Sequence, residues 1–173
     1  MSIFFRKKNR FEEIYDANVE QIYRFLFLKL GSKDEAEDLT SKTFLRVWET
    51  VNRENPEGGM KNPRAYAYKI ARNLLIDYYR QKRESNIPID DLVVEDKEKR
   101  PDEVAEIDSE MERVRLALKE LNDDYQNVII WHYLNELTIE EIADLMNKSE
   151  TNVRVTIHRA VSAIKREIEK REV

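Results

Sequence analysis

Apolar residues recur at helical spacing through the first half of the chain. Three segments carry such a stripe, residues 11–30, 33–51 and 63–83. Gly31 follows the first, and glycine readily adopts the left-handed conformation that ends many helices. Ser32 with Glu35 forms an S-x-x-E capping box before the second segment. Asn62 followed by Pro63 opens the third. The first half therefore predicts a bundle of three helices.

Helical patterns return near the end of the chain, over residues 109–121, 123–134, 139–146 and 150–168. Thr138 with Glu141 forms a T-x-x-E capping box before the third of these segments. Asn147 suits a left-handed turn, and Ser149 can cap the last helix. The final two helices are therefore predicted to form a helix-turn-helix. The buried face of its second helix is expected to consist of Val153, Ile157, Ala160, Val161, Ile164 and Ile168.

Between these helical parts, residues 84–108 show little periodicity. The segment contains Pro88 and Pro101 and is rich in Asp and Glu, which is typical of a linker, with room for a short helix near its end. The chain has only three Gly and four Pro, which disfavours a many-stranded β fold. The predicted fold is all-α, with two small helical domains (residues 11–83 and 109–170) joined by an acidic flexible linker (residues 84–108). The helix-turn-helix lies in the second domain.

The distribution of charge is more informative than its total. The chain carries 30 Lys and Arg against 35 Asp and Glu, a net charge of -5. Residues 1–83 nevertheless have a net charge of +5, residues 84–108 of -7, and residues 148–173 of +3. Two basic surfaces separated by an acidic segment are therefore predicted, and nucleic acid is a candidate ligand for both.

The composition disfavours several classes of function. The chain has no Cys, which excludes disulfides and thiolate metal sites. Its two histidines, His132 and His158, fit a core face and an exposed helix face, and the sequence holds no glycine-rich phosphate loop. No apolar run reaches the length of a signal-peptide core or a transmembrane span. We therefore expect a soluble, cytoplasmic protein without membrane insertion, which is not an enzyme and holds no metal or cofactor.

One face of the last helix carries groups that can read DNA, namely Glu150, Thr151, Arg154, Val155, His158 and Arg159. A recognition helix places its N-terminal residues against base edges in the major groove. Arginine can form two hydrogen bonds with guanine, and threonine and valine can contact a thymine methyl group. The alternative, from this stretch alone, is an ordinary amphipathic hairpin with a solvated basic face.

Three stretches in order carry a resemblance to a known family. They are DEAEDLTSKTFLRVWE at residues 34–49, NPRAYAYKIARNLLIDYYRQKR at residues 62–83 and LTIEEIADLMNKSETNVRVTIHRA at residues 137–160. With an acidic segment between the second and third, the chain resembles bacterial sigma factors of the extracytoplasmic-function group. The resemblance covers residues 11–83 and 109–168. It implies a two-domain, all-helical subunit of RNA polymerase that directs transcription initiation at promoters.

The resemblance assigns a partner to each region. The second helix would dock on the clamp helices of the largest core subunit, through Asp38, Leu39, Thr43 and Phe44. The third helix and the loop before it would recognise and open the minus-ten element, through Lys61, Arg64, Arg72, Asn73, Tyr79 and Arg80. The last helix would read the minus-thirty-five element, through Thr151, Arg154, Val155, His158 and Arg159.

The third helix matches the chemistry that opening of DNA requires. Melted strands are held by stacking and by positive charge along the backbone. Besides its basic residues, this helix offers the aromatic side chains Tyr66, Tyr68, Tyr78 and Tyr79, and residues 55–61 would line a base pocket. The resemblance further implies that the flap tip of the second-largest core subunit contacts the second domain. An anti-sigma factor is a further partner that the resemblance suggests.

Two other hypotheses differ in class. A stand-alone helix-turn-helix regulator accounts for residues 137–168, but it leaves the basic, aromatic helix at residues 63–83 without a role and predicts dimers on palindromic sites. An enzyme acting on nucleic acid would need a catalytic constellation, and the abundant carboxylates are explained as charged helix surface. The sigma-factor hypothesis accounts for both basic helices.

Overall fold

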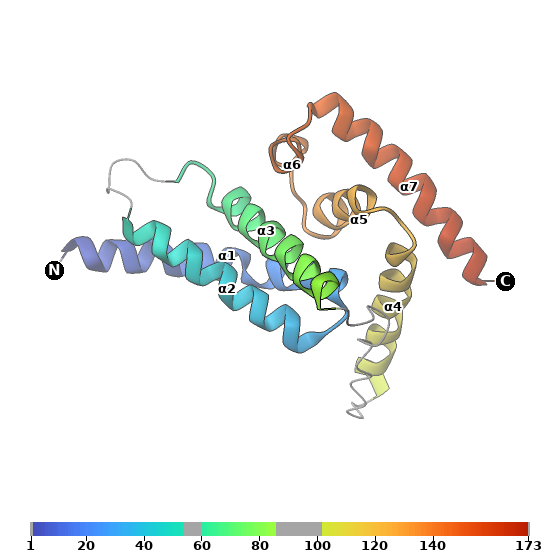
Figure 1. Cartoon of the computed structure of the whole chain (residues 1–173), viewed down its shortest axis with the longest axis horizontal. Coiled ribbons are helices and arrows are strands. Elements are labelled where there is room, and N and C mark those ends of the chain that lie inside the picture. The colour runs from blue at the N-terminus through green and yellow to red at the C-terminus, as the bar shows by residue number, and fades with distance from the viewer. Residues whose placement is uncertain (1, 54–59, 86–101, 173) are drawn as a thin grey trace. The chain divides into compact units, whose positions relative to one another are not determined.

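The structure is a computed structural model that describes residues 2–53, 60–85 and 102–172, and within these ranges it contains helices but no strand. Figure 1 shows the helices in chain order. The chain divides into two compact units, Met1–Val93 and Val94–Val173. The predicted all-α fold with two helical domains is therefore confirmed. Residues 54–59 of the predicted minus-ten loop and residues 86–101 of the predicted linker lie outside the described residues.

The described part of the first unit forms α1 (Ser2–Leu30), α2 (Lys33–Arg53) and α3 (Pro63–Glu84). α1 begins well before Phe11, where the apolar stripe predicted its start. Residues 2–10 contain neither Gly nor Pro, so nothing in this segment interrupts the helix. The predicted end is confirmed, because Gly31 has a φ of 69° and its N–H donates to the Phe27 carbonyl at 2.8 Å.

The three helices of the first unit share one apolar core. α1 packs on α2 and α3, and α2 packs on α3. The side chains without exposed surface include Ile22, Phe25, Leu26, Val47, Ala67, Tyr68 and Ala71. Burial of one large apolar side chain contributes about 1.5–3 kcal/mol, so this core supplies much of the stability of the unit. Tyr68 is a correction to the prediction, because its ring lies 6.0 Å from that of Phe25 in the core and does not face a DNA strand.

The start of α3 is held by a side-chain cap and a hydroxyl pair. Asn62 Oδ1 accepts a hydrogen bond from the Ala65 N–H at 3.0 Å, and Pro63 occupies the first turn, as predicted. The hydroxyls of Tyr66 and Thr50 lie 2.8 Å apart, which links the first turn of α3 to the last part of α2.

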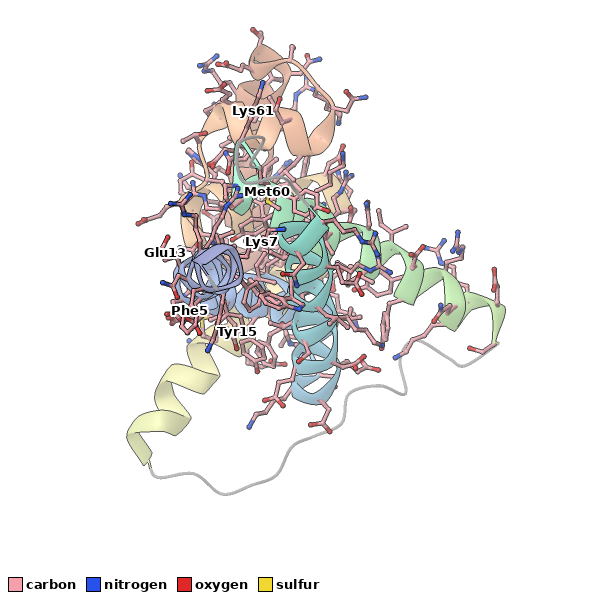
Figure 2. The ribbon with its side chains drawn as sticks, turned by 90° about the vertical axis from the view of Figure 1, so that its left-hand side faces the viewer. Phe5, Lys7, Glu13, Tyr15, Met60 and Lys61 are labelled. Carbon is pink, nitrogen blue, oxygen red and sulfur yellow. The ribbon has the colours of Figure 1, made fainter. Side chains whose placement is uncertain are left out.

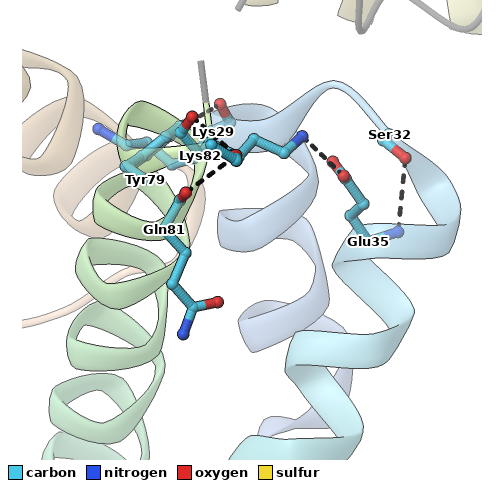
Figure 3. A network of polar contacts seen from close by, with 7 residues as sticks. Lys29, Ser32, Glu35, Tyr79, Gln81 and Lys82 are labelled. Carbon is cyan, nitrogen blue, oxygen red and sulfur yellow. Dashed lines mark hydrogen bonds and ion pairs between the residues drawn. The ribbon is translucent and has the colours of Figure 1, made fainter. Parts of the chain in front are cut away.

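The end of α3 is held by the polar contacts drawn in Figure 3. Lys82 Nζ donates to the Glu35 carboxylate at 2.8 Å, and the Tyr79 hydroxyl donates to the Lys29 carbonyl at 2.7 Å. The predicted capping box of α2 forms in part. The Glu35 N–H donates to the Ser32 hydroxyl at 3.4 Å, while the Glu35 carboxylate pairs with Lys82 across the bundle. Glu35 thereby joins the start of α2 to the end of α3.

The described part of the second unit forms α4 (Asp102–Lys119), α5 (Asp123–Ile129), the π turn η2 (Ile130–Leu134), α6 (Ile139–Met146) and α7 (Glu150–Glu172). α4 begins inside the predicted linker. α5 begins at Asp123, where the predicted segment begins, and Asn122 caps it, because Asn122 Oδ1 accepts from the Tyr125 N–H at 2.9 Å. α5 and η2 replace the single helix predicted over residues 123–134.

The helix-turn-helix is confirmed in α6 and α7. The Glu141 N–H donates to the Thr138 hydroxyl at 3.2 Å, and the Thr138 N–H donates to the Glu141 carboxylate at 2.9 Å, which completes the predicted capping box. Asn147 has a φ of 53° in the left-handed region. The Asn152 N–H donates to the Ser149 hydroxyl at 3.2 Å, so Ser149 caps α7. Each turn residue thus has the role that its chemistry predicts.

The buried stripe of α7 is shorter than predicted. Val153, Ile157 and Ala160 are buried, whereas Ile164 is only half-buried and Ile168 is 39% exposed. α7 has 23 residues and α6 has eight, so the last turns of α7 extend beyond α6. Those turns contact α4, where the Arg171 guanidinium donates to the Leu116 carbonyl at 3.2 Å.

The left-handed conformation of Asn147 predicts how substitutions there affect stability. We expect Asn147→Gly to leave the free energy of unfolding of the second unit unchanged or higher, and Asn147→Ala to lower it by about 1 kcal/mol, because a Cβ without a polar group is strained at this φ. Urea unfolding in a Trp48→Phe background, followed by the fluorescence of Trp131, measures this unit. Equal stability of the two variants would contradict the account.

Candidate nucleic-acid interface

The residues predicted to read DNA on α7 share its exposed face. Thr151, Arg154, Val155, His158 and Arg159 are all exposed, and they lie opposite the buried side chains of the same helix. Val155 exposes 43% of its surface to solvent, although it is apolar and lies between two arginines. A face that combines arginines with an exposed aliphatic side chain can both hydrogen-bond to base edges and contact a thymine methyl group.

The arginine at the centre of this face is only weakly engaged within the protein. The Arg154 guanidinium donates to the Glu150 carboxylate at 3.0 Å, one turn away, and both side chains are about half exposed. Exposed pairs of this kind contribute about 0.3–0.5 kcal/mol, so a guanine can displace Glu150 at little cost. Glu150 also lies in the first turn of α7, where its negative charge interacts favourably with the helix dipole and stabilises the helix.

The turn before α7 is held to the start of α5. Lys148 Nζ donates to the Asp124 carboxylate at 2.6 Å. This contact was not predicted, because the two residues are far apart in the sequence and each looks like ordinary surface charge. The pair joins this turn to the start of α5, and it engages a cation that would otherwise be available for phosphate.

The predicted minus-ten residues differ in exposure. Lys61, Asn73 and Arg80 are exposed, while Arg64, Arg72 and Tyr79 are half-buried. Asn73 and Arg80 share the solvent face of α3 with Lys69, at spacings of four and seven residues. Ile76 lies on the same face and is 51% exposed. Ile76 lies outside the apolar stripe of α3, and from this position the sequence could have predicted an exposed apolar side chain beside Asn73 and Arg80. The sequence analysis did not make that prediction.

The tyrosines of α3 make more contacts within the first unit than predicted. Tyr68 is in the core, the Tyr66 hydroxyl contacts Thr50, and the Tyr79 hydroxyl donates to a main-chain carbonyl of α1. Lys82 Nζ lies 4.4 Å from the centre of the Tyr78 ring, a cation–π contact. Only the half-buried rings of Tyr66, Tyr78 and Tyr79 can offer an edge or face to a base. The predicted stacking surface is therefore smaller than a set of four tyrosines suggests.

The surroundings of Tyr78 favour the neutral form of its hydroxyl. Burial raises the pKa of its hydroxyl far above the usual value, and the neighbouring Glu35 carboxylate raises it further because two negative charges would repel. A neutral hydroxyl next to Glu35 leaves the carboxylate to pair with Lys82, and the end of α3 is thereby held without a competing charge.

Three of the four side chains predicted to dock on the core enzyme are buried. Leu39, Thr43 and Phe44 expose 4%, 0% and 3% of their surface. The Thr43 hydroxyl donates to the Leu39 carbonyl at 2.7 Å, so it is satisfied within α2. These three residues contribute to the core of the unit, although Phe44 also lines the groove described next. Their contact with the core enzyme stays a prediction. Asp38 is exposed and pairs with Lys42 at 2.7 Å.

An apolar groove lies beside these buried residues, between α1 and α2. It has a volume of about 670 Å³ and is lined by Lys8, Phe11, Glu12, Tyr15, Thr40, Ser41, Phe44, Leu45 and Trp48. Leu45 is 58% exposed and Tyr15 is 40% exposed, so apolar surface faces solvent here. The rings of Phe11 and Trp48 lie edge to face at 5.2 Å and form part of the wall. Exposed apolar surface of this kind is typical of protein–protein contacts.

The described residues lack two further features. None of the described helices is both long enough and apolar enough to cross a membrane. Across the same residues, no group of three or more His, Cys, Asp or Glu side chains is placed to hold a metal ion. Charged side chains on the described surface form ion pairs within single helices, such as that between Arg80 and Asp77 at 3.0 Å.

Comparison with protein families finds two matches, one in each unit. Residues 14–85 match the model of sigma-70 region 2, and residues 111–164 match that of sigma-70 region 4. Similar curated proteins include the ECF RNA polymerase sigma factor SigM of Bacillus subtilis, 30% identical over 89% of this chain and 92% of that protein. SigX of the same organism is 27% identical over 92% of this chain and 84% of that protein.

Solved structures show the same fold. CnrH, in complex with the cytosolic domain of CnrY, superimposes with a TM-score of 0.69 and 18% identity, over 94% of this chain and 90% of that chain. The sigma factor RpoE, in complex with the anti-sigma factor NepR from Bartonella quintana, gives the same TM-score and identity over 94% of this chain and 98% of that chain.

Proposed function

The chain belongs to the extracytoplasmic-function sigma factors of RNA polymerase, and we propose that its exposed helix faces divide the work of promoter-specific initiation between the two units. The factor binds core RNA polymerase and promoter DNA. It acts in the cytoplasm as an initiation factor, while the core enzyme supplies the catalysis. The observation that carries the proposal is the presence of two basic helix faces, on α3 and α7, in separate units that match regions 2 and 4.

The exposed face of α7 reads the minus-thirty-five element. Arg154 and Arg159 donate to guanines, and Val155 contacts a thymine methyl group, while Thr151 and His158 flank them. The amide groups at the start of α7 and the helix dipole favour an adjacent phosphate. The contact between Lys148 and Asp124 keeps the turn in place for this purpose.

The exposed face of α3 holds the opened minus-ten element. Lys61, Asn73 and Arg80 are accessible to a strand, and Arg64, Arg72 and Tyr79 border them. Ile76 adds an apolar surface on which a flipped base can rest. Because α3 is held at both ends, this face is presented as a rigid surface, which reduces the entropy lost when a flexible strand binds.

The core enzyme docks on the first unit through the groove between α1 and α2. Leu45 and Trp48 supply apolar contact, and Asp38 supplies charge on the same helix. Leu39, Thr43 and Phe44, which the resemblance implies, remain proposed contacts, and Phe44 lines the same groove. The clamp helices of the largest subunit are the proposed occupant, and the flap tip of the second-largest subunit is the proposed partner of the second unit. The domain boundaries that we propose are residues 11–83 and 109–170, with residues 84–108 as the linker.

An anti-sigma factor is a further proposed partner. The solved RpoE is bound to the anti-sigma factor NepR. A protein that covered the groove beside Leu45 would prevent core docking without touching either DNA face. Regulation through this surface is therefore compatible with the arrangement of the first unit.

Run-off transcription tests the proposed function. Core polymerase is given a library of genomic DNA with and without the chain. We expect new start sites that share two upstream boxes only when the chain is present, because only a sigma factor confers initiation on bare core enzyme. Absence of both initiation and core binding would contradict the proposal and favour a stand-alone helix-turn-helix regulator.

Substitutions on α7 test its role in reading sequence. Arg154→Gln and Arg159→Gln should each weaken initiation about tenfold or more at promoters with an intact minus-thirty-five box, since a guanine contact contributes about 1–3 kcal/mol. Arg113→Gln, an exposed arginine of α4, serves as the matched control. Equal activity of all three variants, or a loss that is independent of the box sequence, would rule out this assignment.

Substitutions on α2 separate docking from stability. Leu45→Asp should weaken core binding at least about tenfold without changing thermal unfolding, because Leu45 is 58% exposed. Phe44→Ala should lower the free energy of unfolding by about 3–5 kcal/mol, because its ring is buried.

The matched control for docking is Ile76→Asp, since Ile76 is 51% exposed but lies on α3. Core affinity is measured by titration of labelled chain with core polymerase. If Leu45→Asp binds core as well as Ile76→Asp does, the groove is not the docking site.

A further inference from the structure

The start of α1 carries basic side chains that have no part in the functions proposed for α3 and α7. Residues 5–10 include Arg6, Lys7, Lys8 and Arg10, and the first turn of α1 contains no acidic residue.

Two of these cations hold α1 against its neighbours. Lys7 Nζ donates to the Asn52 carbonyl at 2.6 Å, in the last turn of α2. The Arg10 guanidinium donates to the Met60 carbonyl at 3.5 Å, just before α3. The start of α1, the end of α2 and the approach to α3 therefore meet at one end of the unit.

α1 has two chemically different sides at this end, as Figure 2 shows along the helix from its start. Lys7 lies on the side of Met60 and Lys61. Phe5 and Tyr15 lie on the opposite side, and Tyr15 lines the apolar groove. Lys7 therefore points away from the surface proposed for core docking, whereas Lys8 lines it.

Three cations at this end are exposed, and within the described part of the chain no ion pair or hydrogen bond involves them. They are Arg6 on α1, Arg53 at the end of α2 and Lys61 before α3. Glu12 and Glu13 are the nearest exposed acids to Arg6 along α1, and Glu12 is paired with Lys8 at 3.7 Å. Glu49 is the nearest described acid to Arg53, while residues 54–59 lie outside the described part of the chain. Exposed guanidinium and ammonium groups of this kind are suited to phosphate.

This end continues the DNA face of α3. α3 has 22 residues and is therefore about 33 Å long. A strand that lies along Arg80, Asn73 and Lys69 reaches Lys61 at the start of the helix. Beyond Lys61, the next exposed cations at this end are Arg6 and Arg53.

We propose that Arg6 and Arg53, together with Lys61, form a phosphate-binding surface for the backbone of the single DNA strand held by α3. The ligand is a phosphodiester chain, bound by charge and without base selectivity. Lys7 and Arg10 keep the start of α1 beside the other two elements. The inference rests on the proposed function of α3. It adds two arginines, one from α1 and one from α2, to the surface by which α3 contacts the single strand.

The test uses holoenzyme assembled from core polymerase and the full chain. Its affinity for a fluorescent single-stranded oligonucleotide with a minus-ten element is measured over a range of salt concentrations. Each phosphate contact with a single strand contributes about 0.7 to the slope of log affinity against log salt. We expect the double variant Arg6→Gln/Arg53→Gln to reduce the slope by about 1.4. The ratio of wild-type affinity to variant affinity should then fall about sevenfold when the salt concentration rises fourfold.

The matched control is Lys33→Gln/Arg113→Gln, which removes the same charge from exposed positions elsewhere. A slope for the Arg6 and Arg53 variant equal to that of wild type and control would overturn the inference. A fall in core affinity without a change in slope would also overturn it, and would assign these arginines to the polymerase. If wild-type holoenzyme fails to bind the strand at all, the proposed function of α3 fails before this inference is reached.

Discussion

Each unit is a thin helical bundle, so every helix must bury one face and leaves the opposite face free. α3 buries Ala67, Ala71 and Leu75, and this fixes Lys69, Asn73 and Arg80 toward solvent. α7 buries Val153, Ile157 and Ala160, and Arg154, Val155 and Arg159 face outward. Which residues lie on the proposed DNA faces therefore follows from which side of each helix packs in the core.

The polar contacts at the ends of the helices preserve these faces. Lys82 and Glu35 expose 14% and 26% of their side chains, so their ion pair is better shielded than most surface pairs. The neutral hydroxyl of Tyr78 lies beside this pair, and the hydroxyl of Tyr79 joins α3 to α1. In the second unit, Asn147 is left-handed in the turn before α7, and the contact of Lys148 with Asp124 joins this turn to the start of α5. Basic residues are gathered on one face of α3 and one face of α7, so a chain with a negative net charge can still present two basic faces.

The sequence was sufficient for much of the fold, because periodicity and caps act locally. Gly31, Asn62 and the pair Thr138 and Glu141 all have their predicted roles. The spacing of Phe44 with Leu39 and Val47 likewise predicts that its ring is buried, as it is. The sequence was insufficient for side chains that suit two roles. Nothing in the pattern shows that the exposed Leu45 borders an apolar groove. The tyrosines of α3 were uncertain because an aromatic ring suits both a core and a base. Contacts between distant residues, such as Lys7 with Asn52, leave no local signal.

The central claim is that each basic face is too small to hold DNA by itself and acts once core polymerase fixes both units. Salt-dependent binding of promoter DNA by the free chain and by the holoenzyme tests it most directly. The account predicts weak binding by the free chain that disappears as salt rises, and tight binding by the holoenzyme at the same salt. Tight binding of promoter duplex by the free chain at moderate salt would contradict it.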